Sequence, residues 1–583
     1  MLHTLSRSLR ENKGPALVTV LLSALEVVFE IVIPLFMSNL IDFGIEGGSM
    51  AAVWKFGAFL LLLAAFQLAT GVLAARIAAR ASVGFAANLR EDMYDNVQTF
   101  AFSNIDKFST ASIVTRLTTD TTNVQNAFQM LMRMAIRAPV MLVFSMIVSF
   151  RISRDISMTF LIILPILALA LFFIIRSVFP VFSRVFRTYD ELNNVVQENV
   201  RGIRVVKSFN QERHEIGKFG AISERIYKDF SKGERLITLN APLMQFCIYT
   251  CMIVISWLGA KAIIASGNDP ALGLTTGNLT ALITYTMQIL SSLMMLSMVF
   301  AMLTISLSSA RRIAEVLEER TDIRQPQYPV ITVRDGAVDF DHVSFVYASK
   351  ADKKVLDDID LHIRSGETIG IIGGTGASKS SLVQLIPRLY DVTGGKLTLG
   401  GVDVRDYDLD TLRGAVAMVL QKNELFSGTI AENLRWGNEN ATDEQLRHAC
   451  KLACADGFIS AMPDGYDTHI EQGGTNVSGG QKQRLCIARA LLKKPKVLIL
   501  DDSTSAVDTR TDAQIQQALS TYIPDTTKII IAQRISSVQN ADRIVVLDDG
   551  HIDAVGSHDE LLRTCEIYRE VYESQQKGGE DDA

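Results

Sequence analysis

Six long apolar stretches lie in the first half of this 583-residue chain, and they restrict its fold more than any other feature. A helix needs about 20 apolar residues to cross a bilayer, and in lipid each helix must satisfy its own backbone hydrogen bonds. We therefore predict an all-α membrane domain of about six transmembrane helices. The stretches cover residues 16–41, 53–75, 138–150 (extended by 131–136), 157–178, 241–264 and 279–307.

The segments between these stretches predict the orientation. Segments 76–133 and 182–239 are long, helical in pattern and rich in Arg and Lys, and such loops stay on the cytoplasmic side. Both termini are then cytoplasmic, the short loops 43–52 and 266–278 are external, and the expected location is the cell membrane. The turn with Arg151 and Arg154 is an exception to this pattern. Residues 1–13 lack a secretory signal and are expected to form a polar surface helix.

Two acidic residues, Glu26 and Glu30, lie within the first stretch on one helix face. An ionised group inside a bilayer costs at least about 2.5 kcal/mol, so these side chains should face a partner or a cavity. The depth of Glu30 permits an ion pair with Arg137, and the alternative is a role in attracting a cationic substrate. The last stretch carries Met294, Met298 and Met302 on one face, which suits either ordinary packing or an adaptable apolar binding wall.

Composition excludes some other functions. The net charge of −6 gives no nucleic-acid signature. The six cysteines are scattered, and the pairs Cys247/Cys251 and Cys450/Cys454 lie four apart on expected helices. We interpret them as small buried apolar residues in a reducing compartment rather than as metal ligands.

A different pattern follows the membrane half. Residues 1–308 form the predicted transmembrane domain, 309–332 a charged and proline-containing linker, and 333–575 a second domain. Short β-type runs alternate with helices in this second domain, which predicts an α/β sheet. The acidic residues 576–583 are expected to form a disordered tail.

The second domain contains a phosphate-binding loop after a strand-like run that ends at Ile372. Backbone N–H groups of such a loop and of the following helix point at a polyphosphate, a lysine adds a cation, and the next hydroxyl can ligate Mg²⁺. The pattern departs from GxxxxGK[ST] at one position, where serine replaces glycine. The predicted loop residues are Gly373, Gly374, Thr375, Gly376, Ala377, Ser378, Lys379, Ser380 and Ser381.

Two more motifs carry phosphate chemistry. A buried strand, 497–500, ends in the carboxylates of Asp501 and Asp502, and Asp501 can hold Mg²⁺. Ser478, Gly479, Gly480 and Gln481 open a helix and form a second anion-binding surface. Two such loops in one domain cannot both reach a single nucleotide.

Together these residues resemble the ATP-binding cassette (ABC) family along nearly the whole chain, in the order and spacing of the family motifs. Lys379–Ser381 resemble the Walker A motif, residues 497–502 resemble the Walker B motif, and residues 477–481 resemble the signature motif. The resemblance further implies that Tyr347 stacks on adenine, that Gln421 serves Mg²⁺ with Ser380 and Asp501, and that Asp508 belongs to the D-loop. A β subdomain, a helical subdomain and coupling helices near 106–116 and 202–209 are implied as well.

The resemblance implies an exporter-type half-transporter that uses ATP and Mg²⁺ and works as a dimer, with each ATP between one Walker A motif and the other chain's signature. Two residues at positions used for hydrolysis depart from the family pattern: Asp502 replaces the usual catalytic Glu, and Gln533 replaces the switch His. Asp retracts its oxygens by about 1 Å, a displacement that can cost on the order of 10²-fold in rate, and Gln carries no positive charge. We expect a site that binds Mg-ATP but hydrolyses it poorly.

The signature is nearly intact, with only Val477 in place of leucine. The expected partner is therefore a second, non-identical half-transporter that carries Glu and His, with drugs, lipids or peptides of hydrophobic or amphipathic character as cargo. The alternatives are a homodimer with two slow sites and an ATP-gated channel or regulatory subunit.

Overall fold

The computed structural model describes residues 1–269, 273–347 and 354–580. It divides into two compact units, one of residues 1–98 and 110–319 and the other of residues 99–109 and 320–583. The two units are described separately below.

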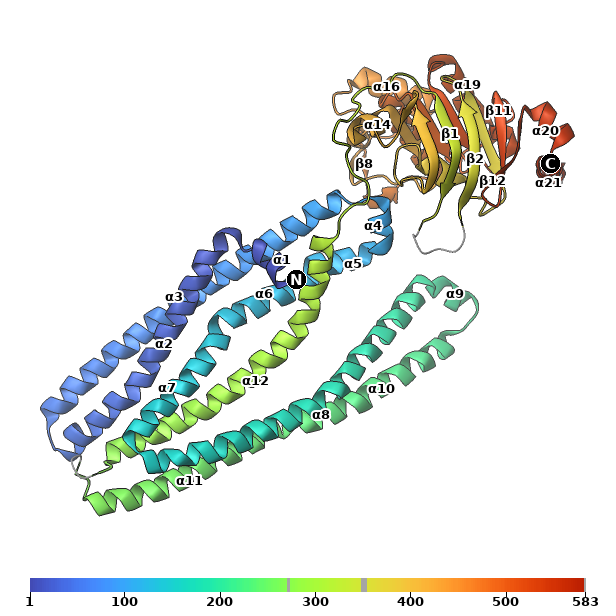
Figure 1. Cartoon of the computed structure of the whole chain (residues 1–583). Helices are drawn as coiled ribbons and strands as arrows, with labels where there is room; N and C mark the ends of the chain where they lie inside the picture. Colours follow the sequence, from blue (N-terminus) through green and yellow to red (C-terminus); the bar gives the residue numbers. More distant parts are fainter. Residues whose placement is uncertain (270–272, 348–353, 581–583) are drawn as a thin grey trace. The chain divides into compact units, whose positions relative to one another are not determined.

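The first unit is entirely helical (Figure 1). Over the described residues, six helical segments are long and apolar enough to cross a membrane, which confirms the predicted number. These segments are Arg10–Glu46, Met50–Gln98, Thr110–Ile152, Arg154–Arg201, Glu212–Ser266 and Thr276–Phe300. The helical elements are α1 (Leu2–Arg7), η1 (Arg10–Asn12), α2 (Lys13–Asn39), η2 (Leu40–Glu46), α3 (Met50–Gln98), α5 (Thr110–Thr115), η3 (Arg116–Asp120), α6 (Thr121–Met130), η4 (Leu131–Ala135), α7 (Ile136–Ile152), α8 (Arg154–Arg201), α9 (Ile203–Ser208), α10 (Glu212–Thr238), α11 (Asn240–Ser266) and α12 (Thr276–Glu318).

Two apolar clusters hold the membrane helices together. One joins α8, α11 and α12 through residues such as Leu167, Ile255 and Leu290. The other joins α2, α7 and α12, where the buried Tyr285 hydroxyl donates a hydrogen bond of 2.6 Å to the carbonyl of Ile31. Because lipid supplies no hydrophobic force between helices, such close packing and interhelical hydrogen bonds set their arrangement.

The helices α8 and α10 run side by side, and the short helix α9 joins their ends (Figure 1). The sequence places a coupling helix at 202–209, and α9 covers Ile203–Ser208. The other predicted coupling segment, 106–116, begins in the last two residues of α4 (Phe102–Lys107), contains α5 and ends at the first residue of η3. Of these, α4 belongs to the second compact unit.

The second unit is an α/β domain with a six-stranded sheet of order β12-β11-β3-β10-β9-β6, in which β12 alone is antiparallel. A four-stranded antiparallel sheet has the order β2-β1-β4-β5. The strands are β1 (Val338–Phe345), β2 (Leu356–Ile363), β3 (Thr368–Gly373), β4 (Gly394–Leu399), β5 (Val402–Asp403), β6 (Val416–Val419), β7 (Gly428–Thr429), β8 (His469–Ile470), β9 (Val497–Asp501), β10 (Thr527–Ile531), β11 (Arg543–Asp548) and β12 (His551–Gly556).

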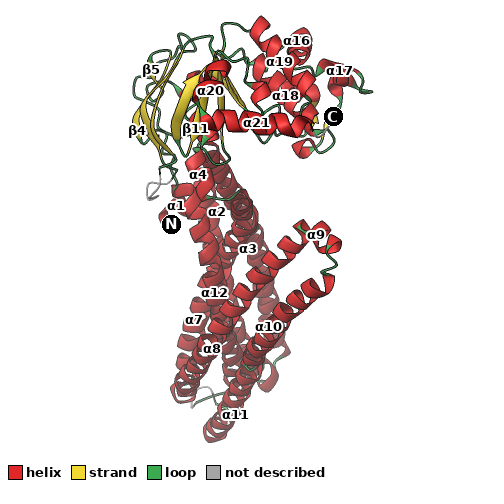
Figure 2. Cartoon of the chain, turned by 90° about the vertical axis from the view of Figure 1, so that its right-hand side faces the viewer, coloured by secondary structure: helices red, strands yellow, loops and turns green. Residues whose placement is uncertain are grey.

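The strands β4 and β5 lie at one end of this unit and most of its helices at the other (Figure 2). The helices are α13 (Lys379–Gln384), α14 (Leu409–Ala415), α15 (Ile430–Arg435), α16 (Asp443–Leu452), α17 (Asp456–Ser460), η5 (Gly465–Asp467), η6 (Gln472–Gly474), α18 (Gly479–Leu492), α19 (Thr509–Tyr522), η7 (Ile535–Ser537), α20 (His558–Thr564) and α21 (Glu566–Glu580). The predicted tail overlaps the end of α21, and its last three residues lie outside the described residues.

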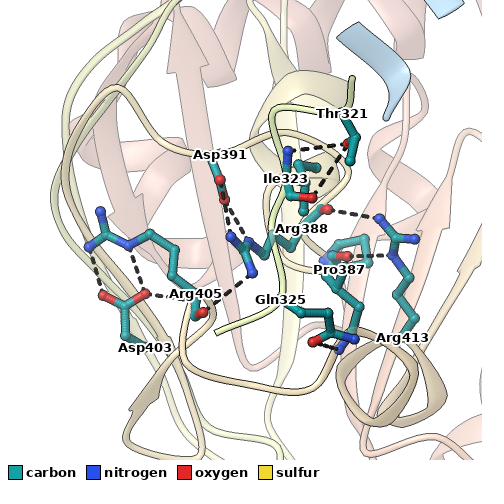
Figure 3. A network of polar contacts seen from close by, with 10 residues as sticks. Thr321, Ile323, Gln325, Pro387, Arg388, Asp391, Asp403, Arg405 and Arg413 are labelled. Atoms are coloured by element: carbon teal, nitrogen blue, oxygen red, sulfur yellow. Dashed lines mark hydrogen bonds and ion pairs between the residues drawn. The ribbon is translucent and has the colours of Figure 1, made fainter. Parts of the chain in front are cut away.

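Polar contacts join the linker and the region after α13 to α14 and to the turn that follows β5 (Figure 3). Gln325 donates to Asp408 at 3.0 Å, and Arg388, which is 4% exposed, forms an ion pair of 2.7 Å with Asp391. Arg413 donates to the carbonyl of Arg388. These contacts fix the segment that contains Tyr390, which bears on the nucleotide site described next.

Candidate functional site

The phosphate-binding loop follows β3, the strand between β11 and β10 in the main sheet. Glycine is required at Gly373 by packing, because a Cβ there would lie 2.1 Å from the carbonyl oxygen of Leu547. Ser378 has φ +66° and ψ +22°, a left-handed conformation that costs a side-chain-bearing residue about 1–2 kcal/mol. The serine that replaces glycine in the sequence pattern therefore stands at a position where glycine would be unstrained.

Lys379 begins α13 and folds back over the loop, where its Nζ donates to the carbonyls of Gly373 and Gly374 at 2.8 Å each. Burial lowers the pKa of this ammonium group, and the carboxylates of Asp501 and Asp502 oppose that shift. A polyphosphate beside Lys379 would favour its charged form. The lysine and the loop therefore fit an anionic phosphate ligand.

Asp501 ends β9 and is only 4% exposed. Burial raises the pKa of its carboxyl group, while a hydrogen bond from Ser380 opposes the shift and Asp502 adds to it. A divalent cation would favour the ionised form, and Mg²⁺ is commonly held by one or two carboxylates together with phosphate oxygens. The carboxylate of Asp501 and the hydroxyl of Ser380 are oxygen ligands of the kind that Mg²⁺ prefers, and Gln421, the third predicted ligand, lies on the same cavity lining.

These residues border a cavity of about 690 Å³. Its lining unites most of the nucleotide-site residues predicted from the sequence, although they come from segments up to 186 positions apart in the chain, from Tyr347 to Gln533. The predicted residues on the lining are Tyr347, Gly373–Ser381, Gln421, Asp501, Asp502 and Gln533. Among the described residues, four others on the lining were not predicted, because none belongs to a motif with a recognisable phosphate chemistry: Lys354, Val355, Ile531 and Asp549.

Tyr347 lies next to the phosphate-binding helix, and its hydroxyl is 2.7 Å from the hydroxyl of Ser381. Its ring meets the ring of Tyr390 edge to face at a centroid distance of 5.1 Å. Tyr390 in turn donates a hydrogen bond of 2.8 Å to Asp106 and packs against Phe102, both on α4. An aromatic contact thus connects the cavity wall with a predicted coupling helix of the same unit.

Asp502 and Gln533, which replace the Glu and His that the family uses for hydrolysis, contact each other. One carboxylate oxygen of Asp502, Oδ2, accepts hydrogen bonds from Gln533 Nε2 at 2.9 Å and from Gln421 Nε2 at 3.2 Å. Both donors are neutral amides, so they occupy acceptor positions of this oxygen without placing a positive charge beside it. The Asp502 side chain is therefore held by two neutral amides within the cavity.

Gln575, on α21, holds the backbone of the switch segment beside this pair. Its Nε2 donates to the carbonyl of Gln533 at 2.7 Å, and its Oε1 accepts from the N–H of Ile535 at 2.9 Å. The sequence analysis did not identify Gln575. A lone glutamine near a chain end carries no local signal of such a contact.

The signature residues lie outside the cavity lining. Ser478 and Gln481 form a capping box at the start of α18: the Ser478 hydroxyl accepts from the Gln481 N–H, and the Gln481 side chain accepts from the Ser478 N–H. A Cβ on Gly480 would lie 2.8 Å from the carbonyl of Ala506, whereas one on Gly479 would meet only an ordinary contact at 3.5 Å. Packing thus requires glycine at 480 but leaves Gly479 open to a ligand.

The D-loop residue Asp508 is also outside the cavity lining, and it caps α19 by accepting from the N–H of Thr511 at 2.9 Å. The D-loop is joined to the signature helix by Gln483, which is 5% exposed and bonds to Ser505 and to the N–H of Ala506. The structure therefore separates the predicted residues into a Walker side and a signature side.

The acidic pair in the membrane unit is bound to one arginine. Arg137 Nη1 donates to Glu26 at 2.8 Å and Nη2 donates to Glu30 at 2.7 Å. The three side chains remain 11–24% exposed. Of the two partners considered from the sequence, the structure contains the ion pair, and it includes both carboxylates. Met294 and Met298 on α12 are 46% and 62% exposed.

The membrane helices and the phosphate-binding α/β domain together define a class of protein, the membrane proteins that carry a nucleotide-binding domain in the same chain. Comparison with known proteins specifies the family. The profile described as ABC transporter transmembrane region matches residues 16–294, and the profile described as ABC transporter matches residues 356–505.

The curated relatives include the uncharacterised ABC transporter ATP-binding protein YfiB of Bacillus subtilis, 35% identical over 96% of each chain. Another is the uncharacterised ABC transporter ATP-binding protein Rv1273c of Mycobacterium tuberculosis, 33% identical over 99% of this chain and 98% of the relative. A solved bacterial Atm1-family ABC exporter with ATP bound has a similar fold, with a TM-score of 0.79, 24% identity and coverage of 97% and 98%. The chain belongs to the ABC transporter family, and it joins the transmembrane region and the ATP-binding region of that family in one polypeptide.

Proposed function

We propose that this chain is one subunit of a heterodimeric ABC exporter, and that its Walker side forms the degenerate ATP site. It binds Mg-ATP at its Walker side, hydrolyses it slowly, and lends its signature to the competent site of a non-identical partner chain. The cargo is hydrophobic or amphipathic, and the complex lies in the cell membrane with both termini in the cytoplasm, as the basic loop segments favour.

The observation that carries this proposal is the contact of Asp502 with two glutamine amides. Hydrolysis requires a carboxylate that orients the attacking water and a cationic donor near the transferred phosphoryl group. Asp502 is one methylene short for the first task and is already bound by Gln421 and Gln533. Gln533 cannot supply the positive charge needed for the second.

The remaining roles follow from the geometry of the cavity and the family resemblance. Lys379 and the loop amides hold the phosphates, while Ser380, Gln421 and Asp501 serve Mg²⁺. Tyr347 stacks on adenine with its ring fixed by Ser381. Ser478–Gln481 contact the nucleotide bound to the partner, and Gly479 leaves room for that approach. ATP binding would bring the two cassettes together, and hydrolysis mainly at the partner's Walker side would reset them.

The first test is the ATPase rate of the full-length chain in lipid nanodiscs, alone and with its candidate partner. A suitable candidate is a half-transporter encoded beside this chain that carries Glu and His at the corresponding positions. We expect tight Mg-ATP binding and slow turnover by this chain alone, with much faster turnover by the pair. Rapid hydrolysis by this chain alone would contradict the proposal, and electrical recordings showing ATP-dependent current without uphill accumulation would support a channel instead.

The charge cluster in the membrane permits a test of cargo class. Arg137 holds both Glu26 and Glu30, so loss of one partner leaves a weaker ion pair in a medium of low dielectric constant. Glu30→Gln should lower the thermal unfolding temperature of the nanodisc-embedded chain if the cluster serves stability alone. Transport of cationic and neutral dyes by the pair supplies the comparison, because a selective loss of cationic transport would assign Glu30 to substrate recognition.

A further inference from the structure

We propose that Gln575 is a positioning residue of the ATP site, acting from the C-terminal helix through the backbone of the switch segment. The inference rests on the proposed function in one respect, namely that the chain's own Walker side retains ATP. It assigns a role to a residue outside every nucleotide-binding motif.

The two contacts of Gln575 use both ends of one carboxamide group. Its Nε2 donates to the Gln533 carbonyl, and its Oε1 accepts from the Ile535 N–H. Ile535 begins the short helix η7, whose own N-cap residue, Arg534, makes no side-chain cap hydrogen bond. The cap that this helix start lacks locally is therefore supplied by α21, which satisfies a backbone donor of the kind that helix ends leave unpaired.

The position of Gln575 is itself fixed by the packing of α21. Tyr568 is fully buried and lies 2.8 Å from His558, and Val571 and Tyr572 pack against the same core. Residues 568, 571, 572 and 575 recur at the spacing of a single helix face. Gln575 thus extends from a firmly packed stripe toward the switch segment, whereas Gln576 donates only to Tyr572 within its own helix.

The contacts of Gln575 affect Asp502 through the side chain of Gln533. The backbone at 533–535 sets the direction of the Gln533 side chain, whose amide donates to Asp502 at 2.9 Å. The opposite side of η7 is held by Ser537, which donates to Asp512 at 2.6 Å. Without the Gln575 side chain, the switch segment keeps the contact between Ser537 and α19 but loses the hydrogen bonds at Gln533 and Ile535. The side-chain amide of Gln533 can then leave Asp502.

The test compares nucleotide dissociation from the full-length chain in lipid nanodiscs, with fluorescent ATP and ADP analogues displaced by excess Mg-ATP. Four forms are measured against wild type: Gln575→Ala, the matched control Gln576→Ala, Gln533→Ala, and the double variant Gln533→Ala with Gln575→Ala. Two ordinary hydrogen bonds correspond to an effect of about tenfold. We expect Gln575→Ala to release ATP about tenfold faster and ADP within twofold of wild type, because the family resemblance puts the switch residue beside the terminal phosphate.

The remaining variants separate positioning from general stability. Gln576→Ala should behave as wild type, and Gln575→Ala should have no further effect once Gln533→Ala has removed the amide that it positions. The proposal is overturned if Gln575→Ala and Gln576→Ala agree, if ATP and ADP are accelerated equally, or if the two changes add in full. Phosphate release by wild type is recorded in parallel. Rapid turnover would contradict the proposed slow hydrolysis at this site, and the four variants would then be compared by their kcat values instead.

Discussion

The Walker side and the signature side of the cassette differ in how they depart from the family pattern. On the Walker side, Ser378 adopts a left-handed backbone conformation and Asp502 is bound by Gln421 and Gln533. On the signature side, the capping box of α18 is complete and only Val477 differs, at a position buried in the core. The altered residues of the Walker side line the cavity, so they change the chemistry of the site while the fold stays intact.

The comparison also separates two reasons for keeping a motif. Ser478 and Gly480 have structural duties, one as the cap of α18 and the other because a side chain would strike Ala506. Gly479 has no such duty within this chain. The glycine at position 479 therefore favours a role of the signature in binding a ligand, because the packing of this chain does not require it.

The largest effect is expected from a double substitution that restores the family residues on the Walker side. Asp502→Glu combined with Gln533→His lengthens the carboxylate by one methylene and adds a residue that can carry a positive charge. We expect ATP hydrolysis at this site to rise by about 100-fold, the order associated with a correction of about 1 Å in position. Phosphate release by the full-length chain gives the rate. The control, Asp502→Asn with Gln533→His, has no carboxylate and should show no rise; an equal rise in both would contradict the assignment of Asp502.

A smaller effect tests the signature side. Gly479→Ala places a Cβ at an ordinary 3.5 Å contact, so the cassette should remain as stable as wild type while ATP hydrolysis by the two-chain complex falls about 10- to 100-fold. ATPase measurements on the complex and thermal unfolding of this chain supply the two values. Unchanged hydrolysis would remove the distinction between Gly479 and its neighbour.

Gly480→Ala is the matched comparison for that experiment. Its Cβ would lie 2.8 Å from the carbonyl of Ala506, so overpacking should destabilise the chain by about 1–3 kcal/mol. We expect the thermal unfolding temperature to fall in this variant and to stay unchanged in Gly479→Ala. Equal stabilities would show that the D-loop can move away from α18 without cost.

The smallest expected effect concerns the strained serine of the phosphate loop. Ser378→Gly removes a left-handed side-chain residue, a conformation that costs about 1–2 kcal/mol. The thermal unfolding of the chain should therefore shift upward, while Ser378→Ala keeps the strain and should show no such gain. A gain in both variants would trace the effect to the hydroxyl group rather than to the backbone.

Much of the candidate site could be predicted because its motifs are local. A strand, a glycine turn and Lys379 stand within a few residues of one another, and the backbone geometry of that turn follows from its composition. The parallel strands β3 and β9 were also predictable from their apolar runs. The strands that were not predicted have only two residues or contain Asp, Gly or Lys, which are depleted in strands. They are β2, β4, β5, β7, β8 and β12.

Contacts between distant segments were beyond such reasoning. Gln421, Asp502 and Gln533 meet at one carboxylate oxygen although 112 positions separate the first from the last, and Gln575 reaches the same region from α21. In the membrane unit the sequence permitted an Arg137–Glu30 pair, but the participation of Glu26 emerged only from the structure.

The division into a six-span membrane half and a phosphate-binding half follows from the amino-acid sequence, because apolar length and motif spacing act over short distances along the chain. The folded chain was needed to show which side chains share the cavity, which amides hold Asp502, and which glutamine supports the switch segment. Those contacts depend on the stacking of strands and the docking of α21, and the same local residues would have no such partners in another arrangement.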